Sequence, residues 1–253
     1  VPTALDVGMA AAGIISRLVA GKPGAVLGLA TGASVKPVYA QLVLAHQDRT
    51  LDFSRVTTFN LDEYVGLSPS HPASFHAFME EHFLSRVNVD RRRVHLPPTE
   101  GDDLAALCEK YERDIRAAGG IDLQLLGIGR DGHLGFNEPT SSLASRTRIK
   151  TLTSATREAN RPGFGGKEVP LHVVTMGIGT ILAARHCLLV ADGPAKADAV
   201  ARMVEGPLTA MVPASALQMH PHATVIVDEA AAAGLSLRDY YREVQRNKPD
   251  LQR

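Results

Sequence analysis

Short, nearly continuous apolar segments recur along the chain, and they constrain its fold more than any other sequence feature. Apolar residues follow one another in these segments instead of alternating with polar ones, which is typical of strands buried on both faces. The expected strands are 25–30, 56–61, 121–129, 172–177, 186–192 and 223–228.

Segments with helical periodicity lie between these strands. In residues 103–118, Cys108, Tyr111 and Ile115 fall on one face, and a pair of glycines ends the helix. The expected helices are 4–20, 36–47, 74–86, 102–118, 194–204 and 229–246. Strands that alternate with helices predict an α/β fold, a Rossmann-like open and mostly parallel sheet with helices on both faces.

The chain shows no internal repeat and no low-complexity linker, so we expect a single domain over residues 1–253. Residues 151–170 differ from the rest, because glycine and proline are frequent there and the segment separates two regular regions. This composition predicts a mobile lid over the active site.

Composition argues against several classes of function. Lys and Arg number 27 and Asp and Glu number 27, so no global field draws the protein to nucleic acid or to a membrane. The longest apolar runs are shorter than the roughly 20 residues that a membrane helix needs, and no signal peptide is visible. We expect Cys108 and Cys187, which lack metal-type spacing, to be reduced thiols. A cytoplasmic enzyme is the natural expectation.

The first candidate binding site follows the expected strand 25–30. In open α/β sheets, ligands bind beyond the carboxyl ends of the strands. Thr31, Gly32, Ala33 and Ser34 lie there, just before an expected helix. Free N–H groups at a helix start favour an anion such as phosphate, although an ordinary N-cap and tight turn has the same sequence.

Two cations strengthen the interpretation as an anion site. Lys196 lies at the start of an expected helix, where its charge opposes the helix dipole and a bound anion would compensate. Arg161 lies in the expected lid and is a candidate to close on the same anion. The alternative for Arg161 is a solvated surface charge.

A pair of acids, Asp62 and Glu63, follows the expected strand 56–61. Neighbouring side chains in an extended chain point in opposite directions, so only one of the two faces a given pocket, and Asp62 is the candidate. A desolvated carboxylate has a raised pKa and acts as a general base. A helix cap or turn cap is an equal alternative.

The loop GIGRDGHLGFNEP (127–139) carries the densest group of titratable residues. Its first six residues match G-x-G-x-x-G, but the glycine and proline that follow argue against the helix of a dinucleotide fingerprint. We interpret the glycines as shaping a turn that brings Asp131, His133 and Glu138 together. Carboxylate partners fix the tautomer of a histidine, which then transfers protons near neutral pH. A structural histidine held by a turn aspartate is the alternative.

The same loop lacks the spacing of a metal site. It contains neither H-x-x-x-H nor H-x-E, and we expect no metal there. His220 and His222 leave a surface metal site open, with a plain capping pair as the favoured interpretation.

The chain resembles the glucosamine-6-phosphate deaminase family, also called glucosamine-6-phosphate isomerase, from about residue 26 to residue 228. NLDEYVGL and GRDGHLGFNEP are the most specific motifs. The full set of matching stretches is LGLATGAS, TTFNLDEYVGL, HPASFHAFM, GIGRDGHLGFNEP, SSLASRTRIKTLT, TREAN, VTMGIGT, GPAK, VEG and LQMHPHA.

The resemblance implies a reaction and a role for each candidate residue. Glucosamine 6-phosphate and water become fructose 6-phosphate and ammonia, with no metal or organic cofactor. Asp62 is implied to move a proton between C2 and C1. His133, flanked by Asp131 and Glu138, is implied to open the sugar ring. The turn that begins at Thr31, together with Lys196, is implied to bind the phosphate.

The resemblance also bears on the lid and on regulation. In TREANRPGFGG the arginine comes one place earlier than the family pattern and the segment is shortened, which leaves Arg161 as the candidate for the phosphate. Some bacterial members are hexamers that N-acetylglucosamine 6-phosphate activates. The implied effector residues are Ser141, Ser142, Arg148 and Lys150.

Two other functions stay open. A 6-phosphogluconolactonase-like hydrolase shares the DGH motif but continues toward Ser-Leu-Phe-Pro, so Glu138 discriminates between the two activities. A non-catalytic sugar-phosphate sensor domain would lack Asp62 and His133 and would carry a DNA-binding helix pair.

Overall fold

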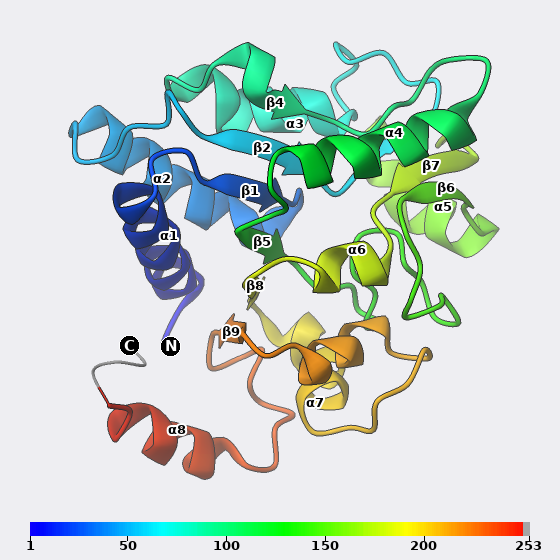
Figure 1. Cartoon of the computed structure of the whole chain (residues 1–253). Helices are drawn as coiled ribbons and strands as arrows, with labels where there is room; N and C mark the ends of the chain where they lie inside the picture. The colour runs from blue at the N-terminus through cyan, green and yellow to red at the C-terminus, as the bar shows by residue number, and fades with distance from the viewer. Residues whose placement is uncertain (250–253) are drawn as a thin grey trace.

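A six-stranded sheet forms the centre of the protein, in a computed structural model that describes residues 1–249. Its strand order is β4-β2-β1-β5-β8-β9, and all of its strand pairs are parallel (Figure 1). The strands are β1 (Val26–Leu29), β2 (Thr57–Asn60), β4 (Val94–His95), β5 (Leu123–Leu126), β8 (Cys187–Ala191) and β9 (Ala223–Val227). The predicted open parallel sheet is therefore confirmed.

Helices cover both faces of this sheet, as the sequence predicts. Figure 1 shows α1 and α2 on one side and α4 and α6 on the other. The helices are α1 (Ala4–Gly21), α2 (Lys36–Gln47), α3 (Phe75–His82), α4 (Leu104–Ala117), α5 (Ser154–Asn160), α6 (Ile178–Leu182), α7 (Ala197–Val204) and α8 (Arg238–Arg246). The strands between them are buried along their length in β1, β5 and β8, which explains their continuous apolar sequence.

The strand order creates a switch point at the centre of the sheet. The chain runs outward from β1 through β2 to β4, and then returns to β5 before it runs outward again through β8 to β9. β1 and β8 therefore flank β5 on either side. The loops that leave the carboxyl ends of these three strands meet there, which is the usual ligand position in such a sheet.

A second, three-stranded sheet lies beside the carboxyl ends, and the sequence did not predict it. It contains β3 (Asp62–Tyr64), β7 (His172–Thr175) and β6 (Arg148–Thr151), paired antiparallel in the order β3-β7-β6. Residues 172–177 thus do form a strand, but the expectation that this strand joins the parallel sheet is wrong. The second sheet has its own small apolar core, which contains Tyr64, Phe136, Leu152, Phe164, Val169 and Val173.

Two expected helices are shorter than predicted. Residues 74–86 form α3 only as far as His82, because Phe83 leaves helical geometry and a 3₁₀ turn follows. Residues 229–246 form a helix only from Arg238. The preceding segment is held in turns instead, since the carboxylate of Asp228 accepts the N–H of Ala231 and that of Gly193.

Among residues 1–249, only helix α1 has the length and apolarity of a membrane span, and the sequence did not predict this. It has 18 residues with a mean hydropathy of 1.4. One side of α1, which includes Val7, Ala11 and Ile15, is buried, and the helix packs on α2, β8 and β9. This packing in the core accounts for the apolar residues of the buried face, whereas Leu5 and Met9 on the helix are exposed.

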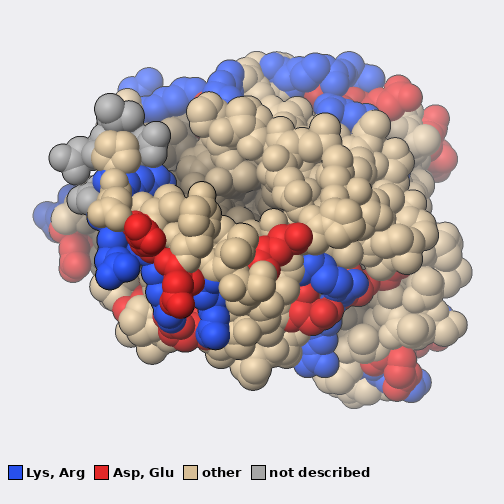
Figure 2. Space-filling view, turned by 90° about the horizontal axis from the view of Figure 1, so that it is seen from below, with Lys and Arg blue, Asp and Glu red and all other residues tan. Residues whose placement is uncertain are grey.

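The surface mixes charges of both signs where Figure 2 displays it. On the face seen from below, basic and acidic side chains lie close together around a broad uncharged area. Among the described residues, surface arginines are matched by acids, for example Arg242 with Glu229 at 2.6 Å and Arg202 with Asp198 at 2.9 Å. This distribution agrees with the formal net charge of zero.

Candidate active site

Asp62 is a buried carboxylate at the first position of β3. Its residue is 6% exposed, and burial, with a smaller contribution from the charge of Glu63, raises its pKa to about 8. Within residues 1–249, no group donates a hydrogen bond to the Asp62 carboxylate. No hydrogen bond therefore offsets the free-energy cost of ionising it. A buried carboxyl with a pKa near neutrality suits a group that accepts and returns a proton.

Glu63, the neighbouring acid, has a different partner. Its carboxylate accepts backbone N–H bonds from Tyr64 at 2.9 Å, Phe75 at 3.1 Å and His76 at 2.8 Å. The last two N–H groups belong to the first turn of α3, which lacks intrahelical partners. Glu63 is therefore a helix cap, and Asp62 points elsewhere, as expected for adjacent positions in a strand.

Asp62 faces the loop 127–139. A Cβ atom at Gly135 would lie 3.3 Å from Oδ2 of Asp62 and 2.8 Å from Oγ1 of Thr175. Gly135 has a φ of 56°, so both its conformation and this close approach favour glycine. Thr175, which is fully buried, accepts the N–H of Phe136 at 3.1 Å and holds the loop against β7.

His133 lies on the same loop, two residues before Gly135. Its Nδ1 atom lies 2.6 Å from Oδ1 of Asp131, and its backbone N–H donates to the same oxygen at 3.2 Å. This contact with the imidazole holds the pKa of Asp131 below its usual range. A Cβ atom at Gly129 would lie 2.1 Å from the His133 ring, so only glycine leaves room for this ring position.

Lys196 reaches the loop from the other side. It ends the 3₁₀ turn after β8, and its Nζ donates a 2.6 Å bond to the carbonyl of Ile128. Burial is the main cause that lowers the pKa of Lys196, and the positive charge of Arg130 adds to it. Asp62 therefore faces loop 127–139, His133 belongs to it, and Lys196 donates a hydrogen bond to it.

The turn that follows β1 lies next to β8. Residues 33–35 form a 3₁₀ turn that continues into α2 and contacts β8. Gly32 has a φ of 120°, and no side chain caps the turn among the described residues. The N–H groups of Ala33 and Ser34 at this start are therefore available to an anion.

Glu138 contacts the expected lid. The Thr156 hydroxyl of α5 donates a short hydrogen bond to its carboxylate. The segment 151–170 contains α5 and is attached to the body of the protein, because Arg157 donates to the carbonyl of Val169 at 2.9 Å and Phe164 is buried. The sequence did not predict α5, the helix inside this segment.

Among the described residues, Arg161 forms no hydrogen bond or ion pair with Lys196 or with the turn at Thr31. Its side chain is about half exposed and pairs with Glu158 at 3.0 Å. Its position at the start of a 3₁₀ turn after α5 keeps it on the outside of the segment in this conformation.

The expected effector residues lie on two neighbouring segments. Ser141 is buried and Ser142 is exposed, in the loop that leaves Glu138. Arg148 and Lys150 lie two residues apart in β6, on its more buried side. Glu112 of α4 anchors the connection between the two segments, since it accepts the N–H of Thr147 at 2.9 Å.

Metal-ligand clusters do not occur in the part of the chain that the structure describes. Nδ1 of His220 accepts the N–H of His222 at 3.0 Å, and Nε2 of His220 lies 2.8 Å from the carbonyl of Ala184. This pair therefore caps a turn. Both cysteines are free and buried.

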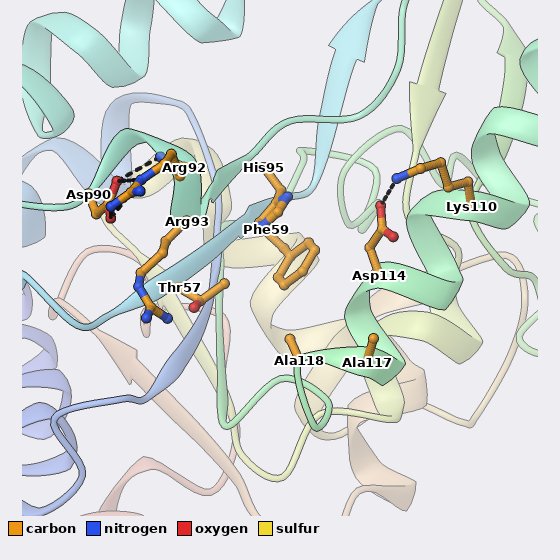
Figure 3. Close-up of a pocket in the computed structure, with 10 residues that line it drawn as sticks. All are labelled: Thr57, Phe59, Asp90, Arg92, Arg93, His95, Lys110, Asp114, Ala117 and Ala118. Carbon is orange, nitrogen blue, oxygen red and sulfur yellow. Dashed lines mark hydrogen bonds and ion pairs between the residues drawn. The ribbon is translucent and has the colours of Figure 1, made fainter.

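An open cavity of about 670 Å³ lies elsewhere, at the outer edge of the parallel sheet (Figure 3). None of the expected site residues lines it. Its charged groups are partly paired, Arg92 with Asp90 at 2.8 Å and Lys110 with Asp114 at 2.6 Å. The lining residues are Thr57, Phe59, Asp90, Arg92, Arg93, His95, Lys110, Asp114, Ala117 and Ala118. We do not assign the chemistry to this cavity.

A buried carboxyl and a histidine beside a turn suited to an anion, at the switch point of a parallel sheet, are typical of α/β enzymes that bind small phosphorylated compounds. Residues 4–226 match the family model described as glucosamine-6-phosphate isomerases/6-phosphogluconolactonase, and the chain belongs to this family.

Individual relatives agree with this assignment. A glucosamine-6-phosphate deaminase of Arthrobacter sp. (strain FB24) is 54% identical over 99% of this chain and 97% of its own length. The solved structure of a monomeric glucosamine-6-phosphate deaminase is 43% identical, covers 92% of this chain and 98% of its own, and superposes with a TM-score of 0.89. A 6-phosphogluconolactonase from Trypanosoma brucei, 18% identical over 93% of this chain and 97% of its own, shares the fold with a TM-score of 0.72.

Proposed function

We propose that this protein is a glucosamine-6-phosphate deaminase, which converts glucosamine 6-phosphate and water to fructose 6-phosphate and ammonia. The observation that carries the proposal is the buried Asp62 carboxyl facing the loop of His133, in a chain 54% identical to an enzyme of that name. An aldose–ketose rearrangement needs this combination, because a carbon-bound proton must be removed and returned close by.

Ring opening is the first step of the proposed mechanism. His133 moves the proton that converts the cyclic sugar to its open-chain aldehyde, and Asp131 stabilises the imidazolium that forms. Glu138 lies on the same loop, where its carboxylate contacts Thr156 of α5, and we assign it a supporting role in this step. Only the open chain has an acidic proton at C2, next to the carbonyl carbon.

Proton transfer between carbons follows. The ionised Asp62 takes the C2 proton, which gives an enol-amine, and returns it to C1, which gives an imine at C2. Water then adds to C2 and ammonia leaves, so that the ketone of fructose 6-phosphate remains. No oxidant or reductant is consumed.

Phosphate binding anchors the far end of the open chain in this proposal. The turn of Thr31, Gly32, Ala33 and Ser34 supplies N–H donors, and Lys196 supplies a positive charge. Fixing one end of a flexible substrate removes much of the entropic cost of aligning its reactive carbons. Arg161 joins the phosphate only if the lid rearranges.

We extend the proposal to organisation and regulation. Residues 1–253 act as one cytoplasmic domain, and the segment 151–170 is its lid. Ser141, Ser142, Arg148 and Lys150 form an effector site for N-acetylglucosamine 6-phosphate, in a homo-oligomer. A flat activity curve against added N-acetylglucosamine 6-phosphate would reject the effector site.

Product analysis tests the activity directly. Incubation with glucosamine 6-phosphate should release ammonia and fructose 6-phosphate in equal amounts, while 6-phosphogluconolactone should be hydrolysed no faster than without the enzyme. The Asp62→Asn variant should bind the amino sugar phosphate but release no ammonia. Lactone hydrolysis without ammonia release would instead support the lactonase alternative.

A further inference from the structure

Arg130 has no assigned role, although it lies inside the loop that gathers the proposed catalytic groups. Its side chain is exposed, directly between Gly129 and Asp131. Within residues 1–249, it forms no hydrogen bond and no ion pair. Asp131, the nearest acid in sequence, is turned toward His133 at 2.6 Å instead.

Lys196 is a cation close enough to Arg130 for the two charges to interact. Its ammonium group bonds the carbonyl of Ile128, two residues before Arg130, at 2.6 Å. The positive charge of Arg130 also helps lower the pKa of Lys196, which places the two cations within electrostatic reach. Two like charges at one partly desolvated loop repel each other, so the pair is unfavourable without an anion.

The acids around this pair do not remove the excess charge by contact. Asp131 and Asp192 both act on Lys196 at longer range. Asp131 is committed to His133, and Oδ1 of Asp192 is buried without a hydrogen-bond partner among the described residues. Neither acid forms an ion pair with Lys196 or Arg130 in that part of the chain.

We propose that Arg130 is a substrate-specificity residue, a fixed second cation that binds the phosphate together with Lys196. This inference rests on the proposed function for the identity of the substrate, and on the loop geometry for the site. A guanidinium matches two phosphate oxygens with two parallel N–H bonds, which an ammonium cannot do. Because Arg130 belongs to the β5 loop and not to residues 151–170, it holds the phosphate before the lid rearranges.

Titration of the full-length protein with inorganic phosphate tests the inference without relying on catalysis. Arg130→Gln should weaken phosphate binding by roughly 10- to 100-fold, the usual effect of losing a charge-assisted contact. Arg130→Lys should restore part of the affinity. With glucosamine 6-phosphate, Arg130→Gln should raise KM by a similar factor and change kcat less than about 3-fold.

Arg93→Ala is the matched control. Arg93 is also an exposed arginine without an ion pair among the described residues, and it lines the edge cavity in Figure 3. Its loss should leave phosphate affinity unchanged. Equal weakening in both variants, or wild-type affinity in Arg130→Gln, would overturn the inference.

These measurements distinguish a failure of the deaminase proposal from a failure of the phosphate role of Arg130. Loss of phosphate binding in Arg130→Gln of a protein that releases no ammonia would support the phosphate role of Arg130 and refute the deaminase. Ammonia release with unchanged phosphate affinity in Arg130→Gln would support the deaminase and refute the role of Arg130.

Discussion

At the scale of single residues, the contrast between Asp62 and Glu63 is the most informative feature. Both carboxylates are buried, but three backbone N–H groups satisfy Glu63, whereas Asp62 has no hydrogen-bond donor among residues 1–249. The sequence predicted that only one of the two faces the pocket. It selected Asp62 for the pocket but did not predict that Glu63 caps α3, because the capped N–H groups lie 12 and 13 residues further along the chain.

The raised pKa of Asp62 predicts a pH dependence of activity. The proposed base must be ionised, so kcat/KM should rise with pH and level off above the pKa of about 8. Initial rates at subsaturating glucosamine 6-phosphate between pH 6 and 9.5 measure this limb. A kcat/KM that is constant across pH 6 to 8 would contradict the role of Asp62.

The same shift predicts a pH dependence of stability. The pKa of Asp62 rises on folding from 3.8 to about 8, so the folded state binds more protons than the unfolded state between these values. The stabilisation from protonated Asp62 is complete below about pH 4 and is lost as pH rises to about 8.

Relative to wild type, Asp62→Asn should therefore gain stability between pH 5 and 8.5, at most by several kcal/mol at about 1.4 kcal/mol per pKa unit. Urea denaturation of both proteins at the two pH values measures the difference, and an equal difference at both would contradict the shift.

At the scale of elements, Glu63 links the second sheet to α3, because it lies in β3 and its carboxylate caps the first turn of the helix. Removing this buried acceptor in Glu63→Ala leaves N–H groups of Phe75 and His76 unsatisfied, and should lower the free energy of unfolding by about 2–4 kcal/mol. Ser74→Ala, which removes the side-chain cap of α3 and the 2.9 Å bond from Oγ to the carbonyl of Pro69, should cost about 1–2 kcal/mol. Denaturant unfolding compares the two, and an equal or smaller cost for Glu63→Ala would contradict the link.

The proposed lid has its own anchor in the small apolar core. Phe164 packs edge-on against Tyr64 with ring centroids 5.1 Å apart, and Asn160 donates to the Tyr64 hydroxyl at 3.2 Å. Phe164→Ala should therefore release residues 154–169 selectively and speed their hydrogen exchange by roughly 10-fold or more, because the lost contacts are local.

A core variant provides the comparison for the lid. Phe53, which is fully buried in the main core, packs edge-on against Phe83 at 5.2 Å. Phe53→Ala should lower global stability by about 3–5 kcal/mol without singling out the lid. If Phe164→Ala changes exchange evenly over the whole protein, the anchor role is wrong.

The elements that the sequence predicted well are those with local signals. The bounds of α2 were predicted as residues 36–47, and the structure gives the same bounds. The strands of the second sheet were missed or misassigned, because β3 has three residues and β6 alternates exposed with half-buried positions and carries Arg148 and Lys150. Their stability comes from pairing across long stretches of chain, which periodicity does not report.

At the scale of the whole molecule, the parallel sheet brings distant residues to one loop. The rule that ligands bind at the carboxyl ends of strands selected the segments after β1, β5 and β8 from the sequence alone. Their meeting at loop 127–139 depends on the strand order, in which β1 and β8 flank β5. The positions of Thr175 and Arg130 carried no sequence signal of this kind, since the first lies in a sheet that was not expected and the second resembles an ordinary surface charge.

In the proposed mechanism, Asp62, His133 and Lys196 act on a single extended substrate. A crystal structure with 2-amino-2-deoxyglucitol 6-phosphate, an open-chain analogue whose C1 is a reduced alcohol, measures this directly. We expect the phosphate against Lys196, Arg130 and the turn at Thr31, with C2 within contact distance of the Asp62 carboxylate. A phosphate bound in the edge cavity beside Arg93, or a C2 atom remote from Asp62, would contradict it.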